Sequence, residues 1–361
     1  MTGAARVLRR TLPRLALALA LGTGGGWLAT RAGVPLPWLL GSMSAATLAA
    51  LAGAPLAAWG PLRAIYMMVL GVLLGSGFSP SMAAGIGAWG VSLSVLVLYS
   101  LGAGLVGTLF FRFAARMRGA TSFFAAMPGG LSEMVMLGQH MGGDVRSISL
   151  AHAVRLLLVV LVLPLAVAAG GDTPEQARAA GPGFAAVTPD ALAVLTGCAL
   201  GGWWLARLAR CPAAPLIGPA VLSAALHLGG VLQAGPPAGI VAAAQVAVGS
   251  AIGACFAGTR IATVARLAVC GAGGTALLFA GLAAFVALGH ALTGMPPAVL
   301  AIAYAPGGLA EMTLVAFSLD AQPAFVATHH IVRLVLIVLV APTGYRLARW
   351  TMARRRAAAG R

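Results

Sequence analysis

Long runs of apolar residues, separated by short polar segments, dominate the chain. A helix needs about 20 mainly apolar residues to cross the roughly 30 Å of hydrocarbon in a bilayer. Ten runs approach that length, at about 14–31, 36–53, 62–78, 87–111, 147–169, 187–206, 214–233, 238–258, 267–289 and 325–346. The pattern therefore predicts an all-α polytopic membrane protein.

Two further apolar segments, at about 120–140 and 297–318, have a different character because each holds a Pro-Gly-Gly sequence and a glutamate. Proline removes a backbone donor, and two glycines permit backbone angles closed to other residues. Such a segment is poorly suited to face lipid. It suits a re-entrant or broken helix that is buried in protein.

The chain contains two copies of one sequence unit. Residues 128–134 (Pro-Gly-Gly-Leu-Ser-Glu-Met) return at 306–312 (Pro-Gly-Gly-Leu-Ala-Glu-Met), 178 positions later. The segment His152-Ala-Val-Arg155-Leu returns at the same distance as His330-Ile-Val-Arg333-Leu. An internal repeat of this length indicates a duplicated domain. We predict a first membrane repeat over 1–170, an external linker over 171–186, a second repeat over 187–350 and a basic cytoplasmic tail over 351–361.

Composition supports a membrane location and argues against several functions. The chain is 60% hydrophobic and 8% charged, far more apolar than a soluble domain. Its net charge of +16 comes from arginines in short loops and at the two ends, which the positive-inside rule explains without a nucleic-acid partner. Four cysteines without C-x-x-C spacing and six scattered histidines indicate no metal site, and we expect no cofactor.

The arginines also discriminate between two topologies. If the Pro-Gly-Gly segments do not cross, each repeat has five spans, and this odd number places the second repeat upside down. With the N-terminus inside, nineteen of the 23 basic residues, all arginines, are cytoplasmic; only Arg31 and Arg178 are external, while Arg155 and Arg333 lie within helices. The alternative with twelve spans leaves six arginines outside. We therefore predict inverted repeats with both termini cytoplasmic.

The repeated residues are the candidate functional site. A short helix that begins after Pro-Gly-Gly would direct its free amides at an anion, and Glu133 and Glu311 would lie in its first turn. These glutamates could cap the helix, couple protons or cations, or pair with the arginines. The glycines could instead serve helix packing alone. The candidate substrate-binding residues are Pro128, Gly129, Gly130, Glu133, Arg155, Pro306, Gly307, Gly308, Glu311 and Arg333.

Each arginine shares a helix face with a histidine three residues earlier. Arg155 and Arg333 could neutralise the glutamates, hold an anionic substrate, or extend toward the membrane surface. His152 and His330 are candidate proton relays, since histidine titrates near neutral pH.

The two Pro-Gly-Gly-Leu-x-Glu-Met segments, each followed by His-x-Val-Arg-Leu, resemble the AbrB-duplication family of bacterial inner-membrane proteins. The resemblance covers almost the whole chain. It implies a multi-pass protein of the inner (cytoplasmic) membrane that is linked to regulation of gene expression, with no defined substrate. Members have also carried the label of an ammonia monooxygenase, which the scattered histidines do not support. The small soluble DNA-binding protein of the same name is not similar to this chain.

Two classes of function remain open, and neither is an enzyme. A secondary transporter would use inverted repeats and broken helices to build a site at the membrane midplane, for a small organic anion or an amphipathic solute. A membrane-embedded regulator of gene expression would act through a partner. The longest segment outside the predicted spans is short and external, which favours transport. The expected partners are the lipid bilayer and a small-molecule substrate, not nucleic acid, and an oligomer is compatible with the sequence.

Overall fold

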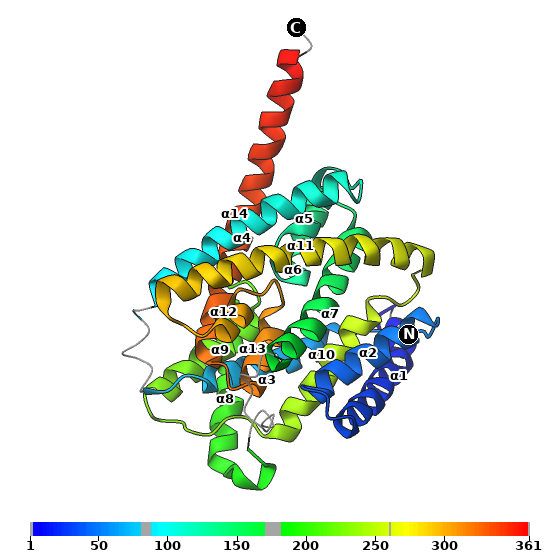
Figure 1. Ribbon diagram of the computed structural model, residues 1–361. Helices are drawn as coiled ribbons and strands as arrows, with labels where there is room; N and C mark the ends of the chain where they lie inside the picture. The colour runs from blue at the N-terminus through cyan, green and yellow to red at the C-terminus, as the bar shows by residue number, and fades with distance from the viewer. Residues whose placement is uncertain (1–2, 81–86, 88, 170–181, 260, 360–361) are drawn as a thin grey trace.

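The described residues of the computed structural model are 3–80, 87, 89–169, 182–259 and 261–359, and they form fourteen α-helices without a strand (Figure 1). Most of the predicted linker, 171–181, lies outside the described residues. The first half contains α1 (Gly3–Arg31), α2 (Pro37–Leu51), α3 (Gly60–Ser76), α4 (Gly90–Phe113), α5 (Gly119–Ala126), α6 (Leu131–His140) and α7 (Val145–Ala169). The second half contains α8 (Pro189–Leu208), α9 (Ala214–Leu228), α10 (Ala238–Ala254), α11 (Ile261–Thr293), α12 (Pro297–Tyr304), α13 (Leu309–Ser318) and α14 (Pro323–Ala359).

The helices confirm the all-α prediction, and each of the ten predicted runs overlaps a helix. Both Pro-Gly-Gly segments are interrupted: α5 and α6 are separated at residues 127–130, and α12 and α13 at 305–308. Helices of 8 and 10 residues are about 12 and 15 Å long at 1.5 Å per residue, so neither piece crosses a bilayer alone.

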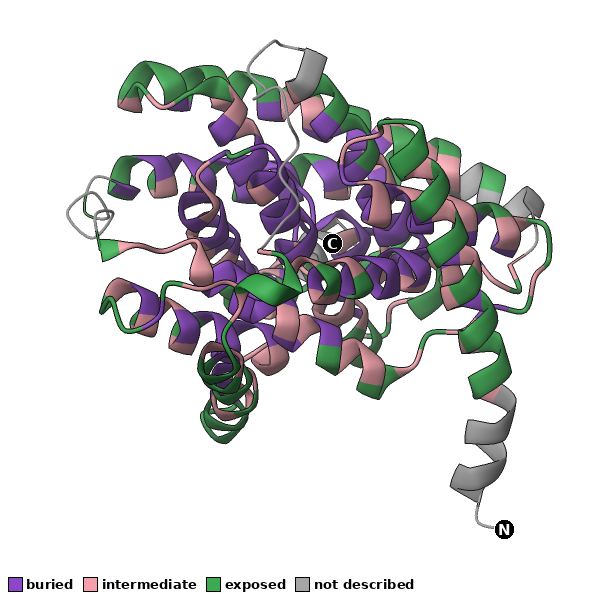
Figure 2. Cartoon of the chain, turned by 90° about the horizontal axis from the view of Figure 1, so that it is seen from below, coloured by how far each residue is buried: buried purple, intermediate pink, exposed green. Residues whose placement is uncertain are grey.

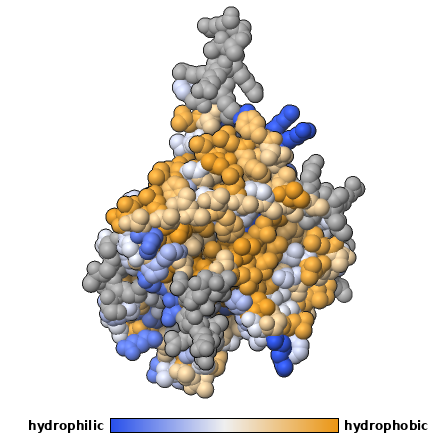
Figure 3. Space-filling model, in the orientation of Figure 1, coloured by the Kyte–Doolittle hydropathy of each residue, from blue (hydrophilic) through white to orange (hydrophobic). Residues whose placement is uncertain are grey.

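Within the described residues, five helices are long and apolar enough to span a membrane: Gly90–Phe113, Val145–Val167, Pro189–Leu208, Ala268–Thr293 and Pro323–Trp350. The chain is therefore a helical membrane protein. Helices α2, α3, α9 and α10 have only 15 to 17 residues and rise about 22 to 26 Å, less than the hydrocarbon thickness. Figure 3 shows apolar side chains over much of the face where α4 and α11 run.

The helices pack in two groups, which we call bundle A and bundle B. Bundle A consists of α1–α3 with α8–α10, and bundle B of α4–α7 with α11–α14. In bundle A, α3 packs on α9 and α10 packs on α2; in bundle B, α4 packs along α11 (Figure 1). The contacts between the bundles include those of α3 with α13 and α14, and of α7 with α2 and α10. Buried residues lie mainly on the inner helices and helix faces, and exposed residues on the outer ones (Figure 2).

Glycines bring helix backbones together in bundle A. A Cβ on Gly25 of α1 would collide with the backbone of Gly41 in α2, and the pair Gly202 and Gly218 repeats this contact between α8 and α9. Small residues allow such close approach in membrane proteins. Helix packing therefore explains these repeated glycines.

We expect Gly25→Leu to destabilise the protein, because the new side chain must force α1 away from α2. Overpacking of this kind costs about 1–3 kcal/mol. The matched control is Gly24→Leu, one residue earlier, where an added Cβ meets nothing within 4 Å. Thermal unfolding in detergent should show a lower midpoint for the first variant only; equal midpoints would contradict the contact.

Candidate functional site

The two breaks are short extended segments. Met127 has φ −55° and ψ 131°, and Gly130 has φ −65° and ψ 141°. In the second copy, Ala305 has φ −49° and ψ 137°, and Gly308 has φ −77° and ψ 151°. Extended backbone ends one helix and lets the next begin after a proline, which cannot continue a helix without losing a hydrogen bond.

The glycines in these breaks do not use left-handed backbone angles, so the conformational reason expected from the sequence is wrong. None of the four is among the described residues with positive φ. Space is the physical reason instead. A Cβ on Gly130 would collide with the carboxylate of Glu133, and a Cβ on Gly308 would collide with that of Glu311. The second glycine of each motif thus leaves room for the glutamate side chain of the same motif.

Arg155 and His152 bind the free carbonyl groups of the first break. Arg155 donates from Nη1 to the Met127 oxygen at 2.9 Å and from Nη2 to the Gly129 oxygen at 3.3 Å. His152 donates from Nε2 to the Phe124 oxygen at 2.8 Å, and its Nδ1 accepts from Arg155 Nη2 at 2.9 Å. Both ring nitrogens are engaged, which fixes the neutral Nε2–H tautomer.

The second copy repeats these four hydrogen bonds. Arg333 donates to the carbonyl oxygens of Ala305 and Gly307, the latter at 2.5 Å, and to His330 Nδ1 at 2.8 Å. His330 Nε2 lies 2.9 Å from the Ile302 oxygen. The repeated His-x-Val-Arg segment therefore satisfies the carbonyl groups that the helix break leaves without partners.

Through these contacts the arginines and histidines stabilise the helix breaks. Arg155 and Arg333 are 4% and 3% exposed, and both histidines are as deeply buried. A buried guanidinium and an unpaired carbonyl each destabilise an apolar interior, and their hydrogen bonds offset both costs. The roles of Arg155 and Arg333 in substrate binding, and of His152 and His330 in proton relay, stay predictions.

The glutamates lie in the first turns of α6 and α13, at the opposite side of each break. Each side chain folds back over the glycine that precedes its helix. A carboxylate in this position faces the free amides and the positive end of the helix dipole. Each broken helix thus carries its own ionic partners, an arginine for the carbonyl end and a glutamate for the amide end.

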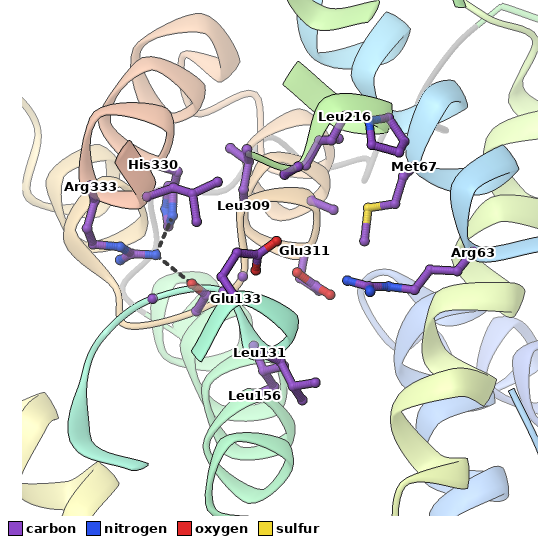
Figure 4. A pocket seen from close by; sticks show the side chains of 18 of the residues that line it. Arg63, Met67, Leu131, Glu133, Leu156, Leu216, Leu309, Glu311, His330 and Arg333 are labelled. Carbon is purple, nitrogen blue, oxygen red and sulfur yellow. Dashed lines mark hydrogen bonds between the residues drawn. The ribbon is translucent and has the colours of Figure 1, made fainter. Parts of the chain in front are cut away.

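A cavity of about 360 Å³ lies between bundles A and B and brings both motif copies together (Figure 4). The predicted residues Pro306, Arg155 and His152 do not line it. The other residues that the sequence analysis predicted for the site do line the cavity: Pro128, Gly129, Gly130, Glu133, Gly307, Gly308, Glu311, His330 and Arg333.

Arg63 of α3 also lines the cavity, and the sequence analysis counted it only among the cytoplasmic arginines. Its guanidinium extends toward the two carboxylates from the side of bundle A (Figure 4). It attracts Glu311, which in turn repels Glu133. The available signal was an arginine at the second position of the predicted run 62–78. The search for repeated residues passed over it because the second copy has Val241 at this place.

The remaining walls of the cavity are apolar. Leu131 and Leu309 follow the glycine pairs, and Leu156 and Leu334 follow the arginines, so both copies contribute matching leucines. Met67 and residues 213–216 at the start of α9 complete the side formed by bundle A. Among the residues that the structure describes, no group of three His, Cys, Asp or Glu gathers as a metal site would require.

These features define a helical membrane protein in which two copies of a broken-helix motif meet at one cavity. The chain belongs to the AbrB family, since the family model described as "Transition state regulatory protein AbrB" matches residues 38–349. It is 28% identical over 354 residues to the protein YhjN of Bacillus subtilis (strain 168), covering 91% of each chain. It is 26% identical over 267 residues to a protein of Escherichia coli (strain K12) named as regulator AbrB, covering 70% of this chain and 73% of that one. No solved structure matches the chain.

Proposed function

We propose that the protein is a secondary transporter of a small solute, bound in the cavity between bundles A and B. The observation that carries the proposal is the meeting of both motif copies at one cavity of about 360 Å³. Broken helices whose ends line a shared site are the way many secondary transporters bind substrate. The volume falls within the range of about 300–1,000 Å³ that small-molecule sites occupy.

We also infer that the two repeats have opposite orientations in the membrane. The exchange of contacts supports this: α3 packs on α9 as α10 packs on α2, and each pair joins one helix from each half. The arginine distribution supports it independently. A reporter fused within residues 172–180 should behave as external; a cytoplasmic signal would contradict the orientation.

The cavity reaches one side of the molecule more than the other. The start of α3 (Gly60) and the start of α9 (Ala213) line it, and both ends are cytoplasmic in the proposed topology. The corresponding positions in the other copy, Ala238 and Leu36, do not line it. This difference supports a state open to the cytoplasm, and exchange of the two repeat conformations would open the opposite side.

The experiment is a screen of small organic anions and amphipathic solutes by thermal shift, followed by uptake of each stabilising compound into proteoliposomes. We expect Ala64→Phe to abolish stabilisation and uptake, because Ala64 lines the cavity and the larger ring fills it. The matched control is Ile65→Phe on the same helix, since Ile65 is 53% exposed.

Equal flux through both variants would exclude the cavity as the transport site. The name of the Escherichia coli relative describes regulation, and a regulator would act through a partner. If no compound stabilises the protein but a cytoplasmic partner co-purifies and requires Arg112, Arg116 and Arg118, regulation replaces transport. If the protein transports a stabilising compound, we infer that any effect on gene expression follows from movement of that compound as a signal molecule.

A further inference from the structure

We propose that the cavity binds a small amphipathic monocarboxylate, whose carboxylate takes the place of Glu133 and Glu311 at the starts of α6 and α13 while the displaced glutamates take up one proton. The inference rests on the proposed transport function and adds its substrate class and its coupling ion.

The ends of α6 and α13 are sites for an anion, and the protein's own carboxylates now occupy them. The first backbone hydrogen bonds after the breaks are those from Met134 N to Gly130 O and from Met312 N to Gly308 O, each at 3.0 Å. The amides of residues 131–133 and 309–311 therefore lack a helical carbonyl partner, as at every helix start. Glu133 and Glu311 fold back onto these ends.

Glu311 provides an independent indication of a ligand. It is 7% exposed and lines the cavity, and its carboxylate accepts a hydrogen bond from its own backbone amide, while no side chain in the described part of the chain donates to it. Its nearest charges are Arg63, which attracts it, and Glu133, which repels it. A buried carboxylate held beside a second one is a group that changes its protonation state when another charge arrives.

The other walls define the chemistry of the ligand. Arg63, which also forms a hydrogen bond with Tyr66, offers a planar guanidinium that can bind a carboxylate, whereas Arg333 gives its guanidinium to carbonyl groups of the chain. The leucines and Met67 provide apolar walls around these polar groups. One carboxylate with a short apolar body matches this lining.

Charge balance determines the coupling. A third carboxylate in the cavity, next to Glu133 and Glu311, would add strong repulsion at low dielectric constant. When one proton binds to the glutamate pair for each anion that enters, the total charge of the cavity stays constant. The neutral carboxyl binds the helix amides less strongly than the anion, so the ligand can replace it. The expected transport mode is symport of one proton with one monocarboxylate.

The test measures binding, not flux, with three probes of equal size: hexanoate, hexylammonium and hexanamide. Calorimetry on the full chain in nanodiscs, at several pH values and in buffers of different ionisation enthalpy, gives affinity and proton uptake together. For the wild-type protein we expect hexanoate to bind with uptake of one proton. Its affinity should fall about tenfold per pH unit once the glutamates are ionised.

The decisive variant is Glu133→Gln with Glu311→Gln, which imitates the protonated pair. It should bind hexanoate with little pH dependence and without proton uptake. The control is Asp190→Asn in the exposed first turn of α8, which should retain the pH dependence of the wild-type protein. Equal unfolding midpoints will show that the double variant is folded.

Two results would overturn the proposal. One is tighter binding of hexylammonium than of hexanoate to the wild-type protein, with loss of that binding in the double variant, since the glutamates would then be a cation site. The other is absence of hexanoate binding to the folded double variant. Neither result affects transport itself, because the uptake assay with Ala64→Phe and Ile65→Phe tests that function separately.

Discussion

Arg333→Ala is expected to lower the free energy of unfolding by about 3–5 kcal/mol, because it leaves three buried acceptors without their donor and each costs about 1–3 kcal/mol. The variant would leave the carbonyl groups of Ala305 and Gly307 and the Nδ1 of His330 without their donor. For a chain of 361 residues the loss corresponds to a fall in unfolding midpoint of roughly 4–7 °C. Size-exclusion chromatography after heating in detergent measures it.

Arg346→Ala provides the control, because Arg346 is exposed on the same helix α14 and should leave the midpoint unchanged. Arg333→Lys should recover only part of the stability, since a single ammonium cannot reach all three acceptors in the guanidinium geometry. An unchanged midpoint for Arg333→Ala together with loss of ligand binding would contradict the role of Arg333 in stabilising the helix break. It would instead make Arg333 a substrate-binding residue.

The sequence predicted much of the architecture because its strongest signals are local. Apolar runs identify helices, and Pro128 and Pro306 mark the breaks, since proline and two glycines cannot continue a helix in lipid without other partners. The family resemblance, carried by the repeated motifs, is confirmed. The residues that meet in the cavity were also predictable in part, because two copies of one motif identify functionally or structurally constrained positions.

The partners of those residues were not predictable, because they depend on packing between segments distant in sequence. Arg333 binds carbonyl groups 28 and 26 residues earlier, and backbone acceptors leave no mark in a sequence. The role of the motif glycines was predicted wrongly for a related reason. Their angles are not left-handed, and only the folded position of Glu133 and Glu311 reveals that a Cβ would displace the carboxylate. Duplication therefore identifies the shared scaffold more readily than the site chemistry.

Arg63 lines the cavity but is not repeated in the second copy, so a search for repeated residues does not find it. The variant Arg63→Val tests whether Arg63 takes part in binding. Valine is the residue that the second copy carries at this position, as Val241 of α10, so the substitution introduces a side chain that the fold already accepts. We expect the unfolding midpoint to change little, because removing a charge from an apolar helix is favourable whereas Glu311 loses its attraction to Arg63. Binding of the transported solute should weaken about 10- to 100-fold, the value of a charged hydrogen-bonded pair of about 1.5–3 kcal/mol.

The reverse substitution, Val241→Arg, separates a specific contact from a general effect of charge. Val241 is 1% exposed and does not line the cavity. An arginine at position 241 therefore cannot restore binding to the Arg63→Val variant unless the opposite side of the protein opens. Binding titrations and uptake for the single and double variants measure this. Normal affinity and flux for Arg63→Val would remove Arg63 from the site and leave the two motif copies as its only charged groups. Lost binding with normal folding would show that the unduplicated residue gives a symmetric scaffold its selectivity for an anion.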